Sequence, residues 1–409
     1  MTVILSINAG SSSLKTTLYA YGEEKKLRSL AKAEIANINQ PPAKLKYSSG
    51  DRQDKKEIGE IKDHAAAFEY VLKTFFGDKD VKEVKDKKNI KYACHRVVQG
   101  GEYHEDQLIT KDTFHKIEAL EDLAPLHNAS AVSLMQACQD QLPETTNVAC
   151  FDSAFHHTMP EATKTYMIDQ TIAKKKGLRK YGFHGLSYSY ITKACAEYLG
   201  KPRDQLNIIA LHLGSGASMC AIKGGKSLDT TMGLTPVSGL PGSSRSGDID
   251  PALIFHYTSD AAKLSPSSTK DLHISTAEEI LNKKSGWKAL TGTSDFADIA
   301  VSDAAAEKKL ALDIFVDRIV GYVGSYYVKL GGHVDALVFA GGIGEKSALL
   351  RKVIVDQVSC LGFTIDEARN NNPEDKSVFV IGEQSGRKTL ICQTDEDFEM
   401  AHNTMMNPK

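Results

Sequence analysis

The sequence predicts an α/β protein built from two related domains, and three observations support this prediction. At 409 residues, the chain is too long for one ordinary hydrophobic core. A plan of apolar strand, Gly-Ser turn and second strand occurs twice, over residues 4–20 and 208–222. Elsewhere, apolar strands end at polar or glycine-rich turns and are separated by helical patterns. We therefore expect two domains of similar plan, each offering a phosphate-binding hairpin to a shared cleft.

The composition is that of an ordinary globular protein. Hydrophobic residues make up 41% and charged residues 25%, and the formal net charge of −2 does not favour nucleic acid or an anionic membrane as the main partner. No apolar run approaches the length of a membrane span, and the N-terminus enters a strand without the regions of a secretory signal. Seven scattered cysteines without a C-x-x-C pair predict reduced, buried thiols. We therefore expect a cytoplasmic protein with neither a disulfide framework nor a zinc site.

The first hairpin is the earliest candidate for a phosphate site. From residue 3 the chain reads Val-Ile-Leu-Ser-Ile-Asn-Ala-Gly-Ser-Ser-Ser-Leu-Lys, an apolar strand that breaks at a glycine and three serines. Such a turn gathers backbone N–H groups and hydroxyls, which a phosphate requires. The spacing is not that of a Walker A loop, and a strand follows instead of a helix. Taken alone, the turn also fits an ordinary Gly/Ser hairpin.

The other elements of the first half follow from local patterns. The lysine- and glutamate-rich stretch 23–63 predicts solvated edge strands and loops. Helices are expected over 65–76, 111–120 and 129–142, the last with Asn128 as its N-cap, and strands over 89–94 and 147–151. Asp152 follows the second of these strands, at the end where α/β sheets collect ligands. An aspartate in this place also commonly caps a helix or a turn.

The second half contains two further polar turns. The loop 243–251 is dense in Gly, Ser and Asp, carries Arg245, and leads into a helix expected to begin near Pro251, with Asp248 and Asp250 as caps. The glycine-rich turn 340–345 follows a strand and precedes a helix expected from Ser347, an arrangement typical of anion or nucleotide sites. Its spacing is not G-x-G-x-x-G, which argues against a dinucleotide-binding oxidoreductase.

The remaining expected helices are 188–199, 278–284 (closed by Gly286), 304–330 and a final one after 397. The expected strands are 207–213, 217–222, 336–339, 377–381 and 388–393.

A set of short motifs, in order along nearly the whole chain, resembles the acetate kinase family. They are Asn-Ala-Gly-Ser-Ser-Ser-Leu-Lys from residue 8, His-Arg from 95, Ala-Pro-Leu-His-Asn from 124, Phe-Asp-Ser-Ala-Phe-His from 151, Gly-Phe-His-Gly from 182, Arg-Ser-Gly-Asp-Ile-Asp-Pro from 245 and Gly-Ile-Gly-Glu from 342. The resemblance implies two duplicated actin-like (ribonuclease H-like) domains with a central active-site cleft. It also implies a homodimer and Mg²⁺-dependent phosphoryl transfer between acetyl phosphate and ADP, with Mn²⁺ as an alternative metal and acetate, acetyl phosphate and nucleotide as the small-molecule partners.

The same resemblance implies domain bounds. Residues 1–154 and 398–409 would form the N-terminal domain, with the first phosphate loop and a closing C-terminal helix. Residues 155–397 would form the second domain, with the nucleotide and phosphate loops and the dimer interface.

Roles for individual residues are likewise implied by the resemblance. Arg96 and Arg245 correspond to arginines that flank the acyl phosphate and the transferred phosphoryl group, and His184 to the histidine that stabilises the transition state. The implied catalytic residues are Asn8, Arg96, Asp152, His184 and Arg245; the metal-associated residues are Asn8, Asp152 and Glu396. The implied acetyl and substrate residues are Arg96, Val98, Leu126, His127, Phe183 and Pro236. The implied donor-binding residues are Ser11, Ser13, Lys15, His212, Gly214, Ser215, Gly216, Asp295, Phe296, Gly342, Ile343 and Gly344.

The chemistry of phosphoryl transfer agrees with these residue types. The reaction asks a protein mainly for in-line positioning and for stabilisation of charge on three oxygens, which planar arginine forks provide. Mg²⁺ prefers one or two carboxylates together with phosphates and water. Acetate is already ionised at neutral pH and needs no general base, so we expect His184 to donate a hydrogen bond to the phosphoryl group.

Three positions depart from the family pattern, and all lie on the donor side. Ser215 stands where Asn is usual, Ser243-Ser244 precede Arg245 where Gly-Thr is usual, and Ala297 stands where an arginine is expected beside the base. ATP and ADP are the default donor and acceptor, while pyrophosphate or phosphate remains an alternative. Propionate or butyrate as the acid, a non-acyl ATPase of the same superfamily, and an actin-like filament protein also remain open.

Overall fold

The computed structural model describes residues 1–120, 125–269, 273–384 and 387–407, apart from the side chains of 125–127. The chain divides into two compact units, Met1–Ala154 together with Asp395–Lys409, and Phe155–Thr394. The backbone therefore passes from the first unit to the second after residue 154 and returns after residue 394.

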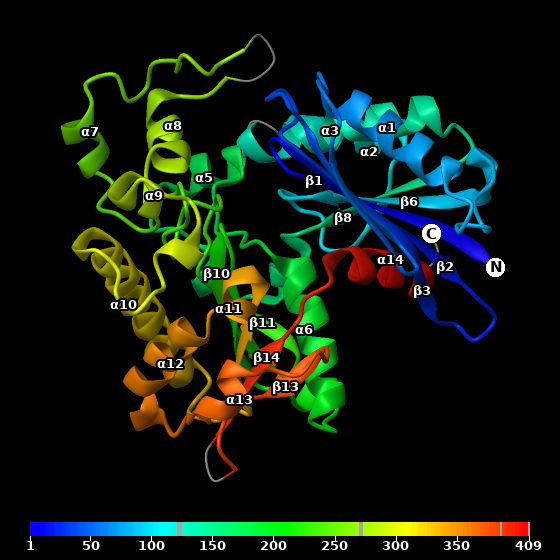
Figure 1. The fold of residues 1–409 in the computed structure, drawn as a ribbon. Helices are drawn as coiled ribbons and strands as arrows, with labels where there is room; N and C mark the ends of the chain where they lie inside the picture. Colours follow the sequence, from blue (N-terminus) through cyan, green and yellow to red (C-terminus); the bar gives the residue numbers. More distant parts are fainter. Residues whose placement is uncertain (121–124, 270–272, 385–386, 408–409) are drawn as a thin grey trace. The chain divides into compact units, whose positions relative to one another are not determined.

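The first unit is built on an eight-stranded sheet with the order β5-β4-β3-β2-β1-β6-β8-β7. Its strands are β1 (Thr2–Ala9), β2 (Ser13–Tyr21), β3 (Leu27–Ala36), β4 (Lys44–Ser49), β5 (Arg52–Glu57), β6 (Ile90–Val97), β7 (Gln107–Leu108) and β8 (Thr146–Phe151). Its helices are α1 (His64–Gly77), α2 (Lys111–Ala119), α3 (Pro125–Gln141) and α14 (Glu396–Met406), with a short 3₁₀ turn at Lys87–Asn89. Apolar residues of β1 to β4 and of α1 and α3 share one buried core. The C-terminal helix α14 packs beside β1, β2 and β6 (Figure 1).

The second unit is built on a six-stranded sheet with the order β11-β10-β9-β12-β14-β13. Its strands are β9 (Ile208–Leu213), β10 (Ala217–Lys223), β11 (Lys226–Thr230), β12 (Ala336–Ala340), β13 (Val378–Val380) and β14 (Lys388–Cys392). Its helices are α4 (Glu161–Lys164), α5 (Gln170–Lys176), α6 (Gly185–Tyr198), α7 (Leu253–Tyr257), α8 (Thr276–Lys283), α9 (Gly286–Thr291), α10 (Ala306–Lys329), α11 (Gly341–Lys346), α12 (Ala348–Gln357) and α13 (Glu367–Asn371). Short 3₁₀ turns occur at Ala154–Thr158, Arg203–Gln205, Phe296–Asp298 and Ser359–Leu361.

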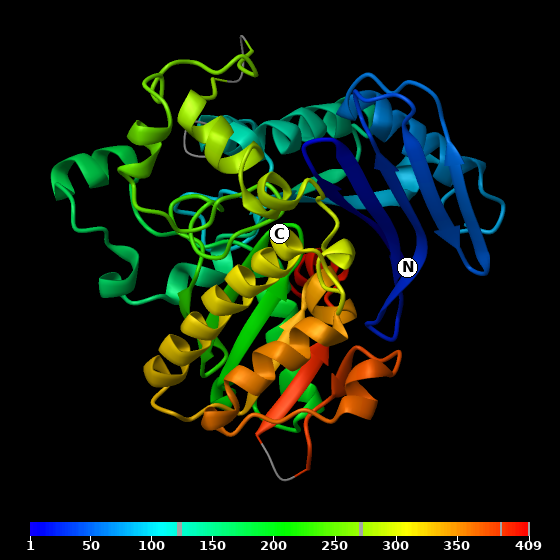
Figure 2. The ribbon, with the colours of Figure 1, turned by 60° about the vertical axis from the view of Figure 1, so that its left-hand side comes forward.

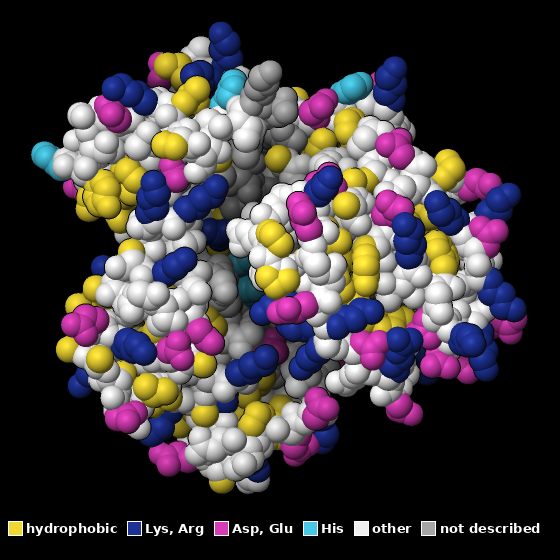
Figure 3. All heavy atoms as spheres, turned by 45° about the horizontal axis from the view of Figure 1, so that its top comes forward, with side chains coloured by type: hydrophobic (Ala, Val, Ile, Leu, Met, Phe, Trp, Pro, Cys, Tyr) yellow, Lys and Arg dark blue, Asp and Glu magenta, His cyan; other side chains and the backbone are white. Residues whose placement is uncertain are grey.

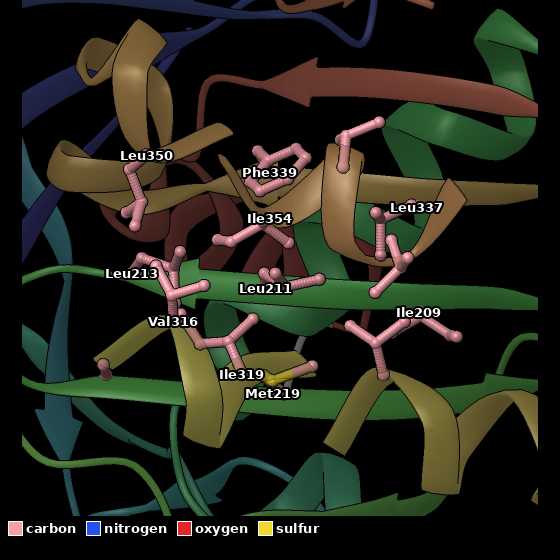
Figure 4. Packing of buried hydrophobic residues seen from close by; sticks show 14 of the residues in the cluster. Ile209, Leu211, Leu213, Met219, Val316, Ile319, Leu337, Phe339, Leu350 and Ile354 are labelled. Carbon is pink, nitrogen blue, oxygen red and sulfur yellow. The ribbon is translucent and has the colours of Figure 1, made fainter. Parts of the chain in front are cut away.

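Helices cover both faces of the second sheet because its strands are apolar on both sides. Ile209 and Leu211 of β9 point to the face where Val316 and Ile319 of α10 and Ile354 of α12 pack (Figure 4). The alternate residues of β9 point to the other face and join a separate core with α6. Figure 2 shows α10 lying along the strands of this sheet. A sheet buried on both faces positions the loops at its strand ends firmly.

The two sheets repeat one strand plan. In the first, β1 pairs antiparallel with β2 and parallel with β6, and β6 pairs parallel with β8. In the second, β9 pairs antiparallel with β10 and parallel with β12, and β12 pairs parallel with β14. The predicted duplication of an α/β domain is confirmed by this correspondence of order and direction.

Four local predictions are wrong. Asn128 lies inside α3 instead of capping it, because its side chain is bonded to the backbone of Gln99. The helix expected near Pro251 is α7, which starts at Leu253, and Asp250 accepts a hydrogen bond from the backbone of Ala252 just before it. Asp248 does not cap this helix, because it accepts hydrogen bonds from the backbone of Gly239 and the hydroxyl of Tyr322.

The other two errors concern glycines. Gly286 begins α9, although a glycine at this place was expected only to close the preceding helix. The glycine-rich segment 340–345 is largely helical, because α11 spans Gly341–Lys346 and α12 follows it directly.

The surface and the cysteines agree with the composition. Every cysteine except Cys360 is buried and all are free thiols, as expected. Side chains of both charges are interspersed over the face shown in Figure 3. Among the described residues, no helix is both long enough and apolar enough to cross a membrane.

Candidate active site

In the first unit, the predicted residues meet at the carboxyl ends of three parallel strands. Asn8 lies near the end of β1, Arg96 near the end of β6, and Asp152 directly after β8. The register aligns Ile7 with His95 and Val97 with Phe151, which brings these three side chains to one edge of the sheet. The first turn of α14 adds Glu396.

Arg96 is the centre of this group. Its Nε and one terminal nitrogen donate to Asp152 Oδ2 at 3.1 and 2.5 Å, and its other terminal nitrogen donates to Asn8 Oδ1 at 3.1 Å. Asn8 Nδ2 donates to Glu396 Oε2 at 3.3 Å, and that oxygen lies 3.6 Å from Arg96 Nε. Burial opposes the charge on Arg96, but Asp152 and Glu396 more than offset it and raise its pKa. The arginine is therefore held charged and fixed in direction.

The acidic side of the group suits a magnesium ion. Asp152 is fully buried, and Glu396 lies at a helix N-terminus whose N-cap is Asp395. Two carboxylates and an amide oxygen are hard oxygen ligands, and Mg²⁺ commonly takes only one or two carboxylates from the protein. No cluster of three or more His, Cys, Asp or Glu side chains placed to hold a metal occurs in the described ranges. The oxygen donors of Asn8, Asp152 and Glu396 fit Mg²⁺.

The first hairpin turn lies beside this group. Gly10 N–H donates to the carbonyl of Ser13 at 2.8 Å, and the Gly10 carbonyl contacts His64 Nε2 at 2.8 Å. Lys15 is directly opposite Asn8 in the β1–β2 register, and it is exposed, as is Ser11. The predicted phosphate contacts Ser11, Ser13 and Lys15 therefore share one anchored hairpin.

In the second unit, His184 lies where α6 begins. It is the N-cap residue of α6 and has a positive φ of 59°, which costs a non-glycine residue about 1 kcal/mol or more. Its Nδ1 lies 2.8 Å from Ser218 Oγ of β10. Its ring packs on that of His212 with centroids 4.2 Å apart, and His212 Nδ1 in turn lies 2.7 Å from Ser187 Oγ. The histidine is thus held in a strained but fully supported position.

Arg245 reaches the same place from a separate loop. A Cβ on Gly216 would lie 2.9 Å from a terminal nitrogen of Arg245 and 3.8 Å from His184 Nε2, so both side chains face the second hairpin turn. Hydrogen bonds to the turn and to α8 hold the arginine loop, with Ser243 N–H to Ser215 O at 2.9 Å and Ser244 Oγ to Asn282 O at 2.8 Å.

A pocket of about 610 Å³ adjoins the second hairpin turn. It is lined by Gly214, Ser215, Ser294, Asp295, Phe296, Ala297, Ala300, Gly342, Ile343, Lys346, Ser347, Ala348 and Leu349. Six predicted donor-binding residues are therefore brought together from three separate segments. Asp295 accepts a hydrogen bond from the backbone of Ala297, so its carboxylate shapes the pocket wall.

The geometry can be compared with known proteins. The model of the Acetokinase family matches residues 3–402. The chain belongs to the Acetokinase family. A relative named probable acetate kinase, from Emericella nidulans, is 55% identical over 98% of this chain and 96% of its own length. One named acetate kinase, from Bacillus cereus, is 40% identical over 99% of this chain and 98% of its own.

Solved structures agree with these matches. A propionate kinase from Francisella tularensis superposes with a TM-score of 0.86 at 35% identity, covering 98% of this chain and 99% of its own. The acetate kinase of Porphyromonas gingivalis has a TM-score of 0.86 at 32% identity and full coverage of both chains. The duplicated fold predicted here is therefore the actin-like fold of the Acetokinase family.

The residues expected to form the acetyl pocket do not all belong to one unit. Val98 belongs to the first unit and is half-buried, whereas Phe183 and Pro236 belong to the second and are buried. The backbone of Leu126 and His127 lies in the first turn of α3, and their side chains are outside the described residues. The acetyl pocket formed by these residues stays a prediction. Gly344 is buried in α11 and does not line the donor pocket, and His212 and Gly216 lie outside its lining.

Sequence reasoning missed the residues that support the predicted ones. Ser218 contacts His184, and Tyr188 contacts Ser218 in turn. His156 has a partner at each ring nitrogen, with Nε2 2.9 Å from the carbonyl of Phe183. Arg351 is buried and bonds to the carbonyls of Gly344 and Glu345 at the end of α11. Each belongs to a strand or helix of ordinary composition, so only a spatial neighbour reveals its role.

Proposed function

We propose that this protein catalyses reversible, direct transfer of a phosphoryl group between ATP and acetate, which gives acetyl phosphate and ADP. The observation that carries the proposal is the Arg96–Asp152–Asn8–Glu396 group at the strand ends of an Acetokinase-family chain. A fixed, charged guanidinium beside two carboxylates fits an anionic substrate together with a magnesium ion.

Each residue has a role that follows from its surroundings. Arg96, whose direction is set by Asp152, would orient the acid or acyl phosphate, and Arg245 would stabilise charge on the transferred group. His184 would donate a hydrogen bond from Nε2 to the same oxygens. Asn8, Asp152 and Glu396 would hold Mg²⁺, or alternatively Mn²⁺, which neutralises phosphate charge when bound.

The pocket beside the second hairpin supports a nucleotide as donor. Its volume of about 610 Å³ falls within the usual range for small-molecule sites, and it runs from the turn at Gly214 and Ser215 to apolar walls at Phe296 and Ile343. A flat base needs such walls, whereas pyrophosphate does not. Ala297 lines this pocket at the position where the family pattern places an arginine.

The identity of the acid rests on the relatives. Those with 55% and 40% identity are named for acetate, and the structural neighbour at 35% identity is named for propionate. We therefore take acetate as the preferred acid and propionate as the nearest competitor.

A panel of donors and acids tests these assignments. The enzyme is assayed with ATP, GTP, pyrophosphate and polyphosphate against acetate, propionate and butyrate, each with Mg²⁺ and with a chelator. We expect the highest kcat/KM with ATP and acetate, and no turnover with the chelator. Preference for pyrophosphate would reject the nucleotide assignment, and hydrolysis of ATP without dependence on an acid would reject acyl kinase activity.

We also propose that two copies associate through the second unit. Exposed large apolar side chains are concentrated there and include Met167, Phe255, Tyr257, Leu264 and Val328, whereas the described part of the first unit offers Met1 and Met406. Large contiguous apolar patches mark interaction surfaces, and these side chains are the candidates for such a patch. Sedimentation equilibrium is expected to give twice the chain mass of 44.6 kDa, and a monomer would reject the proposal.

Two further assignments belong to the same proposal. The first unit would carry the acyl and metal groups and the first phosphate loop, and the second unit would carry the donor pocket and the dimer interface. Free thiols at every cysteine support work in a reducing compartment such as the cytoplasm.

A further inference from the structure

Two buried hydroxyl groups lie behind His184. Ser218 on β10 and Tyr188 on α6 are both 0% exposed. Ser218 Oγ lies 2.8 Å from His184 Nδ1 and 2.6 Å from the Tyr188 hydroxyl, so the three side chains form a continuous chain of hydrogen bonds. Among the described residues, neither hydroxyl forms a hydrogen bond with a side chain outside this group of three.

The direction of this chain follows from counting protons. Tyr188 and Ser218 each have one hydroxyl proton and can each accept one bond from the other. If Tyr188 donates to Ser218 and Ser218 donates to His184 Nδ1, both protons are used. Ser218 could also accept from Tyr188 and from His184 Nδ1–H together, but its own proton would then have no side-chain acceptor among the described residues. If Ser218 donates to Tyr188 instead, the Tyr188 proton has no side-chain acceptor among the described residues, which is costly in a buried site.

The surroundings of Tyr188 support the first arrangement. Burial raises the pKa of Tyr188 well above its usual value, so the phenol keeps its proton. Ser218 Oγ is the side-chain acceptor within reach.

We propose that Tyr188 and Ser218 act as positioning residues that fix the neutral His184 ring with its proton on Nε2. A ring whose Nδ1 accepts a hydrogen bond must carry its proton on the other nitrogen. Nε2 is the nitrogen near Gly216 and Arg245, where the second hairpin turn and the arginine meet. The chain of hydroxyls thus aims an N–H donor toward the place where phosphoryl charge develops.

This inference rests on the proposed function for its catalytic meaning, but the tautomer itself can be measured without activity. Histidine labelled with ¹⁵N distinguishes a protonated ring nitrogen from an unprotonated one. The sequence has 13 histidines, and a His184→Gln variant identifies the signals of His184 by their loss. In the wild-type protein we expect a protonated Nε2 and an unprotonated Nδ1.

Variants test the two hydroxyls separately. Ser218→Ala removes the donor to Nδ1, so we expect a mixture of tautomers and a kcat lower by about 10- to 100-fold, with the KM for ATP and for acetate within about two-fold of wild type. Tyr188→Phe retains the ring and lets the Ser218 hydroxyl rotate, so we expect a smaller loss. Circular dichroism and melting temperature verify that both variants fold.

Ser187, in the first turn of α6 after His184, provides a matched control. Ser187 contacts His212 Nδ1 in the same manner that Ser218 contacts His184. Ser187→Ala is expected to change the ¹⁵N signals of His212 and to leave the protonation of His184 unchanged.

The proposal would be overturned by a proton on Nδ1 of His184 in the wild-type protein, or by a Ser218→Ala variant that keeps both the tautomer and kcat. Full turnover in His184→Gln would have a different meaning. It would remove the catalytic assignment of His184 from the proposed function, whereas a tautomer that depends on Ser218 would still support the hydroxyl chain.

Discussion

The two hairpins share one backbone plan but differ in the side chains around them. The turn after β1 has Asn8 before it and an arginine with two carboxylates beside it. The turn after β9 has His212 before it and a histidine, buried hydroxyls and a glycine-lined pocket beside it. The same strand order therefore presents ionic chemistry in one unit and mainly neutral hydrogen-bonding groups with one arginine in the other. A duplicated fold provides positions at strand ends, and the residues at those positions decide the chemistry.

The arginines test this comparison with the largest expected effects. We expect Arg96→Ala and Arg245→Ala each to lower kcat by about 10³-fold or more, because both forks would stabilise phosphoryl charge. Only Arg96→Ala should also destabilise the fold, by about 3–5 kcal/mol, because it leaves the buried Asp152 without its cation. Steady-state kinetics and urea unfolding measure the two effects.

A double variant separates stability from activity in the first unit. Arg96→Ala with Asp152→Asn removes the unpaired charge, so stability should recover while turnover stays lost. Unchanged turnover in Arg245→Ala would remove the role assigned to that residue.

The two glycine turns should respond differently to an added methyl group. A Cβ at Gly216 would press on the Arg245 guanidinium at 2.9 Å, so Gly216→Ala should lower kcat by about 10-fold or more by moving that arginine. A Cβ at Gly10 would meet the Ser13 hydroxyl at 2.5 Å, which can rotate away. Gly10→Ala should therefore mainly raise the KM for ATP. Equal losses of kcat in both variants would show that the turns are not specialised in this way.

The last prediction concerns stability alone, through a buried histidine in each unit. Burial lowers the pKa of His95 and of His156 from 6.5 to about 4. Between those values the unfolded chain binds more protons, so each histidine contributes stability that is complete above about pH 6.5 and is lost as the pH falls toward 4, by up to about 3 kcal/mol.

Urea unfolding across this range measures the loss. We expect His156→Asn and His95→Asn each to flatten the decline in stability on acidification. His156 satisfies both ring nitrogens, whereas His95 bonds to Asn147 and its Nδ1 has no partner among the described residues. His156→Asn should thus cost more stability at neutral pH, and the reverse order would contradict this account.

Much of the fold was predictable because its signals are local. Apolar strands such as β9 and β12 and long helices such as α10 appear as patterns over consecutive residues. The errors arose where distant contacts outweigh local preference. Asn128 would cap a helix by its type, but the backbone of Gln99 occupies its amide, and the glycines from 341 continue as a helix whose last carbonyls are held by Arg351.

In the candidate site, too, some features follow from local sequence and others from long-range contacts. The residue types and their order, from Asn8 to Glu396, can be read along the chain, and they indicate the family and the kind of chemistry. The folded structure was needed to show that Asp152 and Asn8 share one arginine, and that Tyr188 and Ser218 lie behind His184. The physical reason is that such contacts depend on strand register and helix packing between segments far apart in the chain. A hydrogen bond is satisfied by whatever group those long-range contacts bring within about 3 Å, and no pattern of neighbouring residues specifies that group.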